Sequence, residues 1–445
     1  MKINLTTDTN ITKSLLLFSL PMILGNILQQ FYNIVDTWVV GKYVGKEALA
    51  SVGASYTLMT FLNSVFIGLC MGSGALFAFY YGSRNHSKMK KCMDTALVFI
   101  GGISVVLMIF MRAGLSFILW FLRIPEELRG MTEEYLKVIC FGIIFVFLYN
   151  YFAYLLRSIG NSVIPLVFLA VASVVNVVLD LWFVIGLGWG LKGTAIATVI
   201  AQGASGVGLG IYTYSTRKEL RFSLHHFLIK EKPIKEILQF STITCAQQSV
   251  MNFGILLVQG LVNSFGTTVM AAFAAAVKID TIAYMPAQEF GNAYSMFISQ
   301  NFGAKKKRRV EKGTKSAFLT SAGFCLLVST VIFLWAEQFM KIFVNGKERE
   351  IIHIGIDYLH IEGACYIGIG ILFLLYGYFR GMNRPAVSLL LTVISLGTRV
   401  LLAYTLAPVE TIGVYGIWWS IPIGWVLADM AGIYMMKKNL KQTDV

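Results

Sequence analysis

Charge is scarce in this chain. Only 13% of its 445 residues are Asp, Glu, Lys or Arg, about half the share found in a typical soluble protein. Hydrophobic residues make up 56%, and the mean hydropathy is +0.69. So little charge excludes an ordinary soluble domain. It predicts an all-α integral membrane protein whose helices lie in a lipid bilayer.

Motifs for catalysis and metal binding are also missing. The five histidines lie in or near predicted loops, and no HExxH or GxSxG pattern occurs, so we do not expect an enzyme or a cofactor. The six cysteines are scattered singly, which favours packing roles over metal sites. No P-loop is present, so direct use of ATP is not expected. No cleavable signal peptide is expected either.

Basic residues exceed acidic ones, and the formal net charge is +14. A basic chain often binds nucleic acid, but these Lys and Arg residues lie between hydrophobic runs rather than on one amphipathic face. Membrane topology explains them better, because cytoplasmic loops of membrane proteins are enriched in Lys and Arg. We therefore expect the lipid bilayer, and no nucleic acid, as a partner.

The chain contains an internal duplication. Its motifs recur about 222 residues later. The matching pairs are Phe79–Arg84 with Gln300–Lys305, Arg157–Asn161 with Arg380–Asn383, and Trp189–Gly193 with Ile412–Gly416. Duplication within a hydrophobic chain is typical of transporters built from two halves around a central pathway.

Twelve membrane-spanning helices are predicted. A span needs about 20 apolar residues, and the runs that qualify lie near 14–40, 50–80, 93–111, 133–154, 163–187, 191–214, 236–262, 269–301, 316–343, 354–378, 386–408 and 413–436. Six helices per half is an even number, so both halves insert in the same orientation as a parallel repeat. The predicted domains are residues 1–215 and 236–445, each a six-helix bundle, joined by a cytoplasmic loop at 216–235.

Loop charges predict the orientation. Basic residues cluster after the second, sixth and eighth predicted spans and after the last one, whereas the opposite loops carry several Glu residues. By the positive-inside rule the basic side is cytoplasmic. We therefore expect a multi-pass protein of the cytoplasmic membrane with both termini inside the cell.

Two acidic residues within apolar runs are the leading functional candidates. Asp36 lies in the first predicted span and Asp180 in the fifth. A carboxylate at the centre of a membrane helix costs about 2.5–3.5 kcal/mol on insertion scales, so its presence suggests a function. The alternative is that each Asp only hydrogen-bonds neighbouring groups and holds helices together.

Depth in the membrane links these acids. At 1.5 Å per residue, Asp36, Asp180 and Thr198 each lie about 9 Å below the predicted outer end of a helix. Asn176 precedes Asp180 by one turn, on the same helix face. Two carboxylates in a medium of low dielectric repel, so at least one must bind a cation or a proton. The predicted cation-coupling site is Asp36, Asn176, Asp180 and Thr198, which are also the metal ligands if the ion is Na⁺; Na⁺ and H⁺ both remain possible ions.

The second half does not repeat this set. Val258 aligns with Asp36 and Arg399 with Asn176, so the cation site is predicted in the first half alone. Lys278 and Asp280 are two residues apart and do not face each other on a helix, so each is expected to find a partner elsewhere. The predicted substrate path lies between the halves, with candidate lining residues Gln29, Gln30, Asn33, Gln247, Gln248, Asn252, Met285 and Phe290.

At these residues the chain resembles the multidrug and toxic compound extrusion (MATE) family. The matching features are Pro21 with Asp36 and Gly41, the Gln300-Asn301-Phe302-Gly303-Ala304 segment, Arg157 with Asn161 and Pro165, Asn176 with Asp180, and Gly190 with Gly193 and Ala195. The resemblance implies two six-helix bundles around a V-shaped cleft. It also implies export of organic cations and drugs by exchange with Na⁺ or H⁺, and a cation site at Asp36, Asn176, Asp180 and Thr198. Without an acidic residue inside the seventh span, the chain is closer to the DNA-damage-inducible branch.

The sequence leaves alternatives open. A flippase of lipid-linked precursors from the same superfamily is the main one, although few Lys or Arg residues lie within spans to bind a pyrophosphate. A major-facilitator transporter also has two six-helix halves, but its usual signature after the second span, an acidic residue followed by a Gly-Arg-Arg/Lys type run, is absent. We expect a monomer that takes small amphipathic or cationic substrates, whose identity the sequence does not specify.

Overall fold

The protein is helical throughout the part of the chain that the structure describes. This computed structural model describes residues 3–121, 124–223 and 233–442. Among these residues, 11 helices are long and apolar enough to cross a membrane, or 12 if one bent pair forms a single span. The predicted helical membrane fold is thus confirmed. Much of the predicted linker at 216–235 lies outside the described residues.

The helices before the linker extend beyond the predicted spans at most of their ends. A short helix at 115–121 was not predicted, because seven residues are too few to give a clear hydrophobic period. The helices are α1 (Ile11–Val39), α2 (Lys46–Gly82), α3 (His86–Ala113), α4 (Leu115–Phe121), α5 (Glu126–Ser158), α6 (Val163–Leu181) and α7 (Gly190–Thr216), with π-helical turns η1 (Val40–Val44) and η2 (Trp182–Gly186) and the 3₁₀ turn η3 (Lys218–Leu220).

The helices after the linker follow the predicted order with one difference. The predicted span at 354–378 is broken at Cys365 into two helices bent by 52°. Hydropathy continues through the break, so the sequence pattern alone did not reveal it. The helices are α9 (Ile234–Val262), α10 (Thr267–Gly303), α11 (Lys307–Phe343), α12 (Arg349–Ala364), α13 (Tyr366–Gly381), α14 (Pro385–Leu406) and α15 (Tyr415–Gln442), with the 3₁₀ turn η4 (Asn263–Phe265).

Contacts group the chain into two compact units. The first unit comprises Met1–Asn4 and Leu20–Cys245, and the second comprises Leu5–Ser19 and Ala246–Val445. Two helices are therefore divided: the start of α1 belongs to the second unit, and the start of α9 belongs to the first. The division of α1 falls beside Pro21, a residue that removes a helical hydrogen bond. The predicted bundle limits at 215 and 236 stay a prediction.

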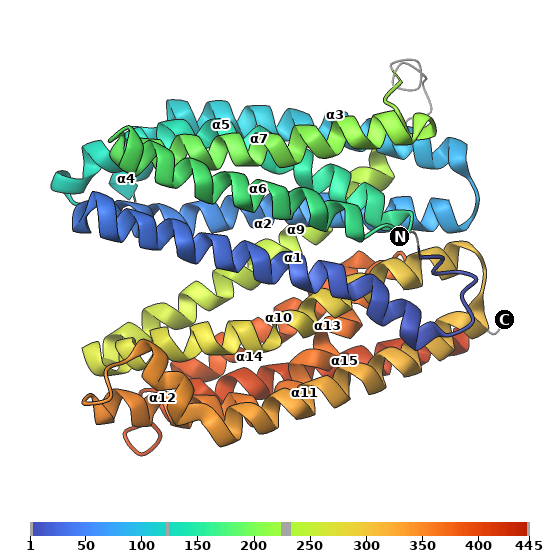
Figure 1. Ribbon diagram of the computed structural model, residues 1–445. Helices are drawn as coiled ribbons and strands as arrows, with labels where there is room; N and C mark the ends of the chain where they lie inside the picture. Colours follow the sequence, from blue (N-terminus) through green and yellow to red (C-terminus); the bar gives the residue numbers. More distant parts are fainter. Residues whose placement is uncertain (1–2, 122–123, 224–232, 443–445) are drawn as a thin grey trace. The chain divides into compact units, whose positions relative to one another are not determined.

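In the first unit, α5 is the central helix. It packs against α2, α3 and α7, and α6 packs against α7 (Figure 1). The start of α9 is fixed to this unit by polar contacts at one end. Ser73 and Ser241 lie 2.6 Å apart between hydroxyl oxygens, and Lys88 forms an ion pair of 2.9 Å with Glu236. These contacts lock the first three turns of α9 against α2 and α3.

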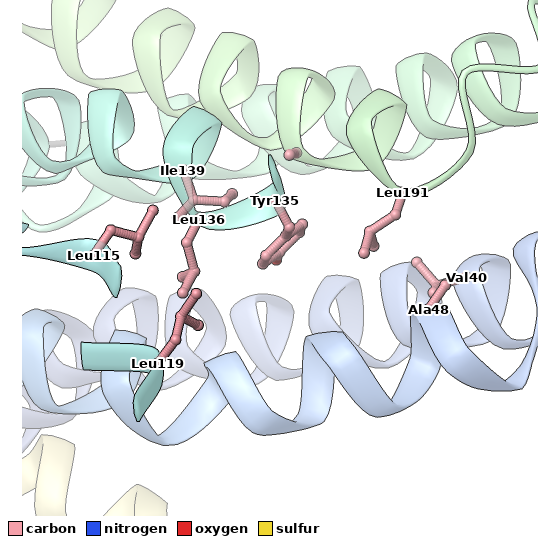
Figure 2. Close-up of a cluster of buried hydrophobic side chains, with 9 residues drawn as sticks. Val40, Ala48, Leu115, Leu119, Tyr135, Leu136, Ile139 and Leu191 are labelled. Atoms are coloured by element: carbon pink, nitrogen blue, oxygen red, sulfur yellow. The ribbon is translucent and has the colours of Figure 1, made fainter. Parts of the chain in front are cut away.

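A hydrophobic cluster closes the other end of the first unit. Figure 2 shows its side chains converging from η1, α2, α4, α5 and α7; they are Val40, Ala48, Leu115, Leu119, Tyr135, Leu136, Ile139 and Leu191, which are labelled, and Ala195. In lipid the gain from such a cluster is close packing rather than removal of apolar surface from water. The cluster holds the π-helical end of α1 near α5 and α7.

In the second unit, α10 packs against α13, and α14 packs against α15. Arg380 is only 2% exposed and donates to Ser295 Oγ at 3.1 Å and to Asn292 Oδ1 at 3.0 Å, both on α10. The segment that begins at Leu5 is held to the same unit, because Asn301 Nδ2 and Arg309 Nε each donate to the carbonyl of Leu5 at 3.1 Å.

Candidate functional site

The structure brings the two predicted carboxylates together. Asp36 on α1 and Asp180 on α6 lie with their carboxyl groups next to each other. Asp180 is fully buried, and no donor from another residue reaches either of its oxygens; Oδ1 of Asp36 has none either. Unpaired carboxylate oxygens facing each other repel and attract a cation or a proton. Residues 144 positions apart in the sequence thus form one local acidic pair.

Two neutral side chains extend this pair. Asn176, 2% exposed, lies one turn before Asp180 on α6, and its Nδ2 is 3.5 Å from Thr198 Oγ1 on α7. That distance is at the limit of a hydrogen bond. Asn176 Oδ1 is buried and unpaired. We define the four residues Asp36, Asn176, Asp180 and Thr198 as the acidic site.

Both helices that carry the acids end in a π-helical turn. Asp36 precedes the start of η1 by four residues, and Asp180 precedes the start of η2 by two. The widened turns are closed by bonds that span five residues, from Gly45 N to Val40 O and from Leu187 N to Trp182 O. Single π-turns occur often at functional sites because they shift the helix face by one residue. No local sequence pattern predicts these π-helical turns.

Two tyrosines that were not predicted as site residues lie beside the acidic site. Tyr135 on α5, part of the cluster in Figure 2, is within electrostatic reach of both Asp36 and Asp180. Tyr32 on α1 lies one turn before Asp36 and beside Gln29. Tyr135 directly follows Glu133 and Glu134 in the sequence, so no local pattern marks it as a buried residue. A phenol can donate a hydrogen bond to a carboxylate and assist cation release.

The donor set at the acidic site fits a monovalent cation or a proton. It supplies two carboxylates, an amide oxygen and a hydroxyl, which are the oxygen donors that hard cations prefer. Elsewhere in the described residues, as here, no three His, Cys, Asp or Glu side chains gather closely enough to hold a metal ion. Softer transition metals use such clusters. The orphaned buried oxygens named above are the observation that supports a cation at this place.

A second acidic cluster lies in the second unit. Asp280 on α10 lies next to Glu362 on α12 and to Tyr366 on α13, and Arg399 on α14 lies within electrostatic reach. The expectation that Asp280 finds its partner on another helix is thus met. The set could not be assembled from the sequence, because its members come from four helices with no shared spacing.

The Lys278 side chain contacts an aromatic ring and not the second acidic cluster. Its ammonium group lies 5.9 Å from the centre of the Phe343 ring. A further acid, Asp429 on α15, is buried and has an unpaired Oδ1, and it was not among the predicted site residues. It stands in an apolar run, the same signal that identified Asp36.

The predicted substrate-path residues fall into two groups. Within the first unit, Gln29, Gln30 and Asn33 are half-buried along one stretch of α1. Within the second unit, Gln247, Met285 and Phe290 are buried at 2%, 4% and 6% exposure, whereas Gln248 and Asn252 are half-buried. Such burial means that Met285 and Phe290 are packed among other side chains. A path formed by these residues stays a prediction.

Fold and site together define a class of protein. Helices that repeat in two sets, span a membrane and bury unpaired acids at membrane depth are typical of secondary transporters, in which such acids bind coupling ions. The sequence model of one family, MatE, matches the chain twice, at residues 21–182 and 244–405. The second match begins 223 residues after the first, which agrees with the duplication found in the sequence. The chain belongs to the MatE family, so it is a transporter and not an enzyme.

Individual relatives are similar over nearly their whole length. The chain is 28% identical over 396 residues to the probable multidrug resistance protein YpnP of Bacillus subtilis, covering 87% of this chain and 86% of that protein. It is 26% identical over 415 residues to the probable multidrug resistance protein NorM of Thermotoga maritima, covering 92% and 88%. Among solved structures, an outward-facing multidrug resistance MATE family transporter gives a TM-score of 0.90 at 22% identity, covering 97% and 96%. The fold is that of the MATE transporters.

Proposed function

We propose that this protein exports amphipathic organic cations and drugs from the cytoplasm in exchange for Na⁺ or H⁺, which binds at the acidic site. The observation that carries the proposal is the contact between Asp36 and Asp180, two acids with unpaired oxygens buried in membrane-spanning helices. The relatives YpnP and NorM are both named as probable multidrug resistance proteins, which supports drugs as substrates. Family membership supports antiport, since MATE transporters are ion-coupled antiporters.

The mechanism follows from alternating access. A cation at the acidic site neutralises the repulsion between Asp36 and Asp180 and so stabilises the conformation in which they are close together. A substrate that binds better to the other conformation shifts the equilibrium in the opposite direction. Exchange results because each ligand favours a different state, and the coupling energy equals the difference in affinity. The substrate-path residues predicted from the sequence are the proposed place of drug binding.

The branch of the family and the membrane orientation are also proposed. We place the chain near the DNA-damage-inducible branch because the carboxylate pair lies in its first half and α9 has no acid after Glu236 in its first turn. Both termini are proposed to be cytoplasmic, in a multi-pass protein of the cell membrane that acts as a monomer. The loops rich in Lys and Arg support that orientation.

Reconstituted export is the test of this function. The protein is reconstituted in liposomes with a fluorescent organic cation, and a Na⁺ gradient and a pH gradient are imposed separately. One of the two gradients should drive movement of the dye across the membrane. The gradient that works identifies the coupling ion. Liposomes carrying the Asp36→Asn variant should show no gradient-driven movement above empty liposomes.

Two results would contradict the proposal. If the wild-type protein moves no dye under either gradient but binds a lipid-linked pyrophosphate, the flippase alternative is favoured. If Asp36→Asn keeps the full gradient-driven rate, coupling does not depend on the acidic site.

A further inference from the structure

A small cavity, lined mostly by apolar groups and by a few polar side chains, lies beside the acidic site, inside the first unit. Its volume is about 40 Å³, which leaves room for about three water molecules. The cavity is lined by residues of α1, α6 and α7, namely Tyr32, Leu169, Ala172, Ser173, Asn176, Thr198, Ala201, Gln202 and Ser205. Asn176 and Thr198 belong both to the acidic site and to this lining, so the two are continuous.

The polar lining continues in one direction from the acidic site. Ser173 precedes Asn176 by three residues on α6, while Gln202 follows Thr198 by four on α7 and Ser205 follows Gln202 by three. Residues three or four apart share a helix face. The two helices run in opposite directions, so both series lead toward the start of α6 and the end of α7. Oxygens thus form a second level about one helical turn, or about 5.4 Å, from the first.

The oxygens at this second level can accept hydrogen bonds, but no donor group reaches them. The hydroxyl of Ser173 donates to Leu169 O at 2.8 Å, and that of Ser205 donates to Gln202 O at 3.0 Å. With their hydrogens engaged, these hydroxyls offer only lone pairs to the cavity. Gln202 Oε1 is buried and has no partner. An unpaired buried carbonyl costs about 1–3 kcal/mol, and a cation or a hydrogen-bond donor that came within reach of this oxygen would remove that cost.

Gly142 on α5 makes room for this amide. A Cβ atom at Gly142 would lie 2.1 Å from Gln202 Oε1, closer than atoms can approach without a shift. The absence of a side chain at Gly142 therefore allows the Gln202 carboxamide to lie where it does.

We propose that Ser173, Gln202 and Ser205 form a second station for the coupling cation, which holds a hydrated monovalent cation between the acidic site and the Thr216 end of the bundle. The station rests on the proposed function, because it carries the same ion. It has no carboxylate, so its binding is weak and the ion moves on to Asp36 and Asp180. The chemistry suits Na⁺ or hydronium, since both are hard cations that bind neutral oxygens and water.

Gln202→Met tests the station, because methionine keeps the length of glutamine and removes its oxygen. Two measurements separate a transit station from the acidic site: the turnover of gradient-driven dye export in liposomes, and the thermal stability of the protein as Na⁺ or pH is titrated. We expect turnover to fall at least tenfold. The cation concentration that gives half of the gain in thermal stability should stay within threefold of the wild-type value. Gly142→Ala should also lower turnover, because the new Cβ atom displaces the Gln202 amide.

Matched controls are present in the chain. Gly130→Ala changes the same helix at a position with nothing within 4 Å of the new Cβ, and Gln259→Met removes an amide whose hydrogen bond, to Asn263, is exposed. Both should keep wild-type turnover.

The outcomes distinguish the station from the proposed function. Wild-type turnover in Gln202→Met overturns the station alone. Equal loss of turnover and of the cation-dependent stability would make Gln202 a ligand of the acidic site, and that also overturns a separate station. If wild type shows neither export nor a cation-dependent stability gain, the proposed function fails and the station fails with it.

Discussion

Asp180→Asn is expected to abolish ion-driven export and to leave the protein at least as stable as wild type without added cation. Asparagine keeps the shape of the side chain and removes the charge that attracts the ion. Loss of one charged partner from a buried site weakens an interaction by about 2–5 kcal/mol, which is roughly 30-fold or more in cation affinity. The same change removes the repulsion between Asp180 and Asp36, so folding does not suffer.

Two measurements check this result. Dye export from liposomes under the effective gradient reports coupling, and the midpoint of thermal aggregation with and without the cation reports binding. A ligand that binds only the folded state raises its stability with concentration. Wild type should show that rise and Asp180→Asn should not.

A matched control is Asp94→Asn in the same unit. Asp94 is also buried, but it forms an ion pair of 3.8 Å with Lys90 in the first turns of α3. Export should survive that substitution. Cation-driven export at the wild-type rate in Asp180→Asn would refute the acidic site, and loss of export in both variants would show that the effect is not specific to it.

Gly72→Ala is expected to destabilise the protein by about 1–3 kcal/mol, the usual range for overpacking. Gly72 on α2 lies against the start of α9, and a Cβ atom there would lie 2.3 Å from Phe240 O. The obstacle is backbone, which moves only if the whole helix moves. Separation of α2 and α9 would also stretch the contact between Ser73 and Ser241. The midpoint of thermal aggregation should fall by several degrees.

Gly53→Ala provides the comparison on the same helix. A Cβ atom at Gly53 has nothing within 4 Å, so the substitution adds only the higher helix propensity of alanine. Alanine is favoured over glycine by about 1 kcal/mol in a helix interior. Gly53→Ala should match or exceed wild-type stability. Equal midpoints for the two variants would mean that the close approach of α2 and α9 does not contribute to stability.

Local patterns in the sequence predicted the membrane helices, the internal duplication and two acids of the site. Apolar runs of sufficient length identified the membrane helices, because lipid requires a long apolar surface on every span. The duplication was visible because both halves keep their glycines and basic residues at one offset. Asp36 and Asp180 were conspicuous because charge is so rare within these runs, and counting residues from helix ends indicated their common depth.

Contacts between helices were not predictable in the same way. The spacing rules of a helix relate residues three or four positions apart, so they identified Asn176 beside Asp180. They give no information on neighbours from other helices. Tyr135 beside the acidic site and Glu362 beside Asp280 come from packing, which depends on the shapes of many side chains at once.

The sequence by itself determined the class of structure, the repeat and the two acids of the first half. The tertiary structure alone decided that the start of α1 belongs to the second unit and the start of α9 to the first, that a span breaks at Cys365, and that a cavity lies beside Gln202. The physical reason is the distance along the chain over which each kind of interaction acts. Hydropathy and helical period act over a few neighbouring residues, whereas a cavity or a shared helix results from interactions between segments far apart in the chain.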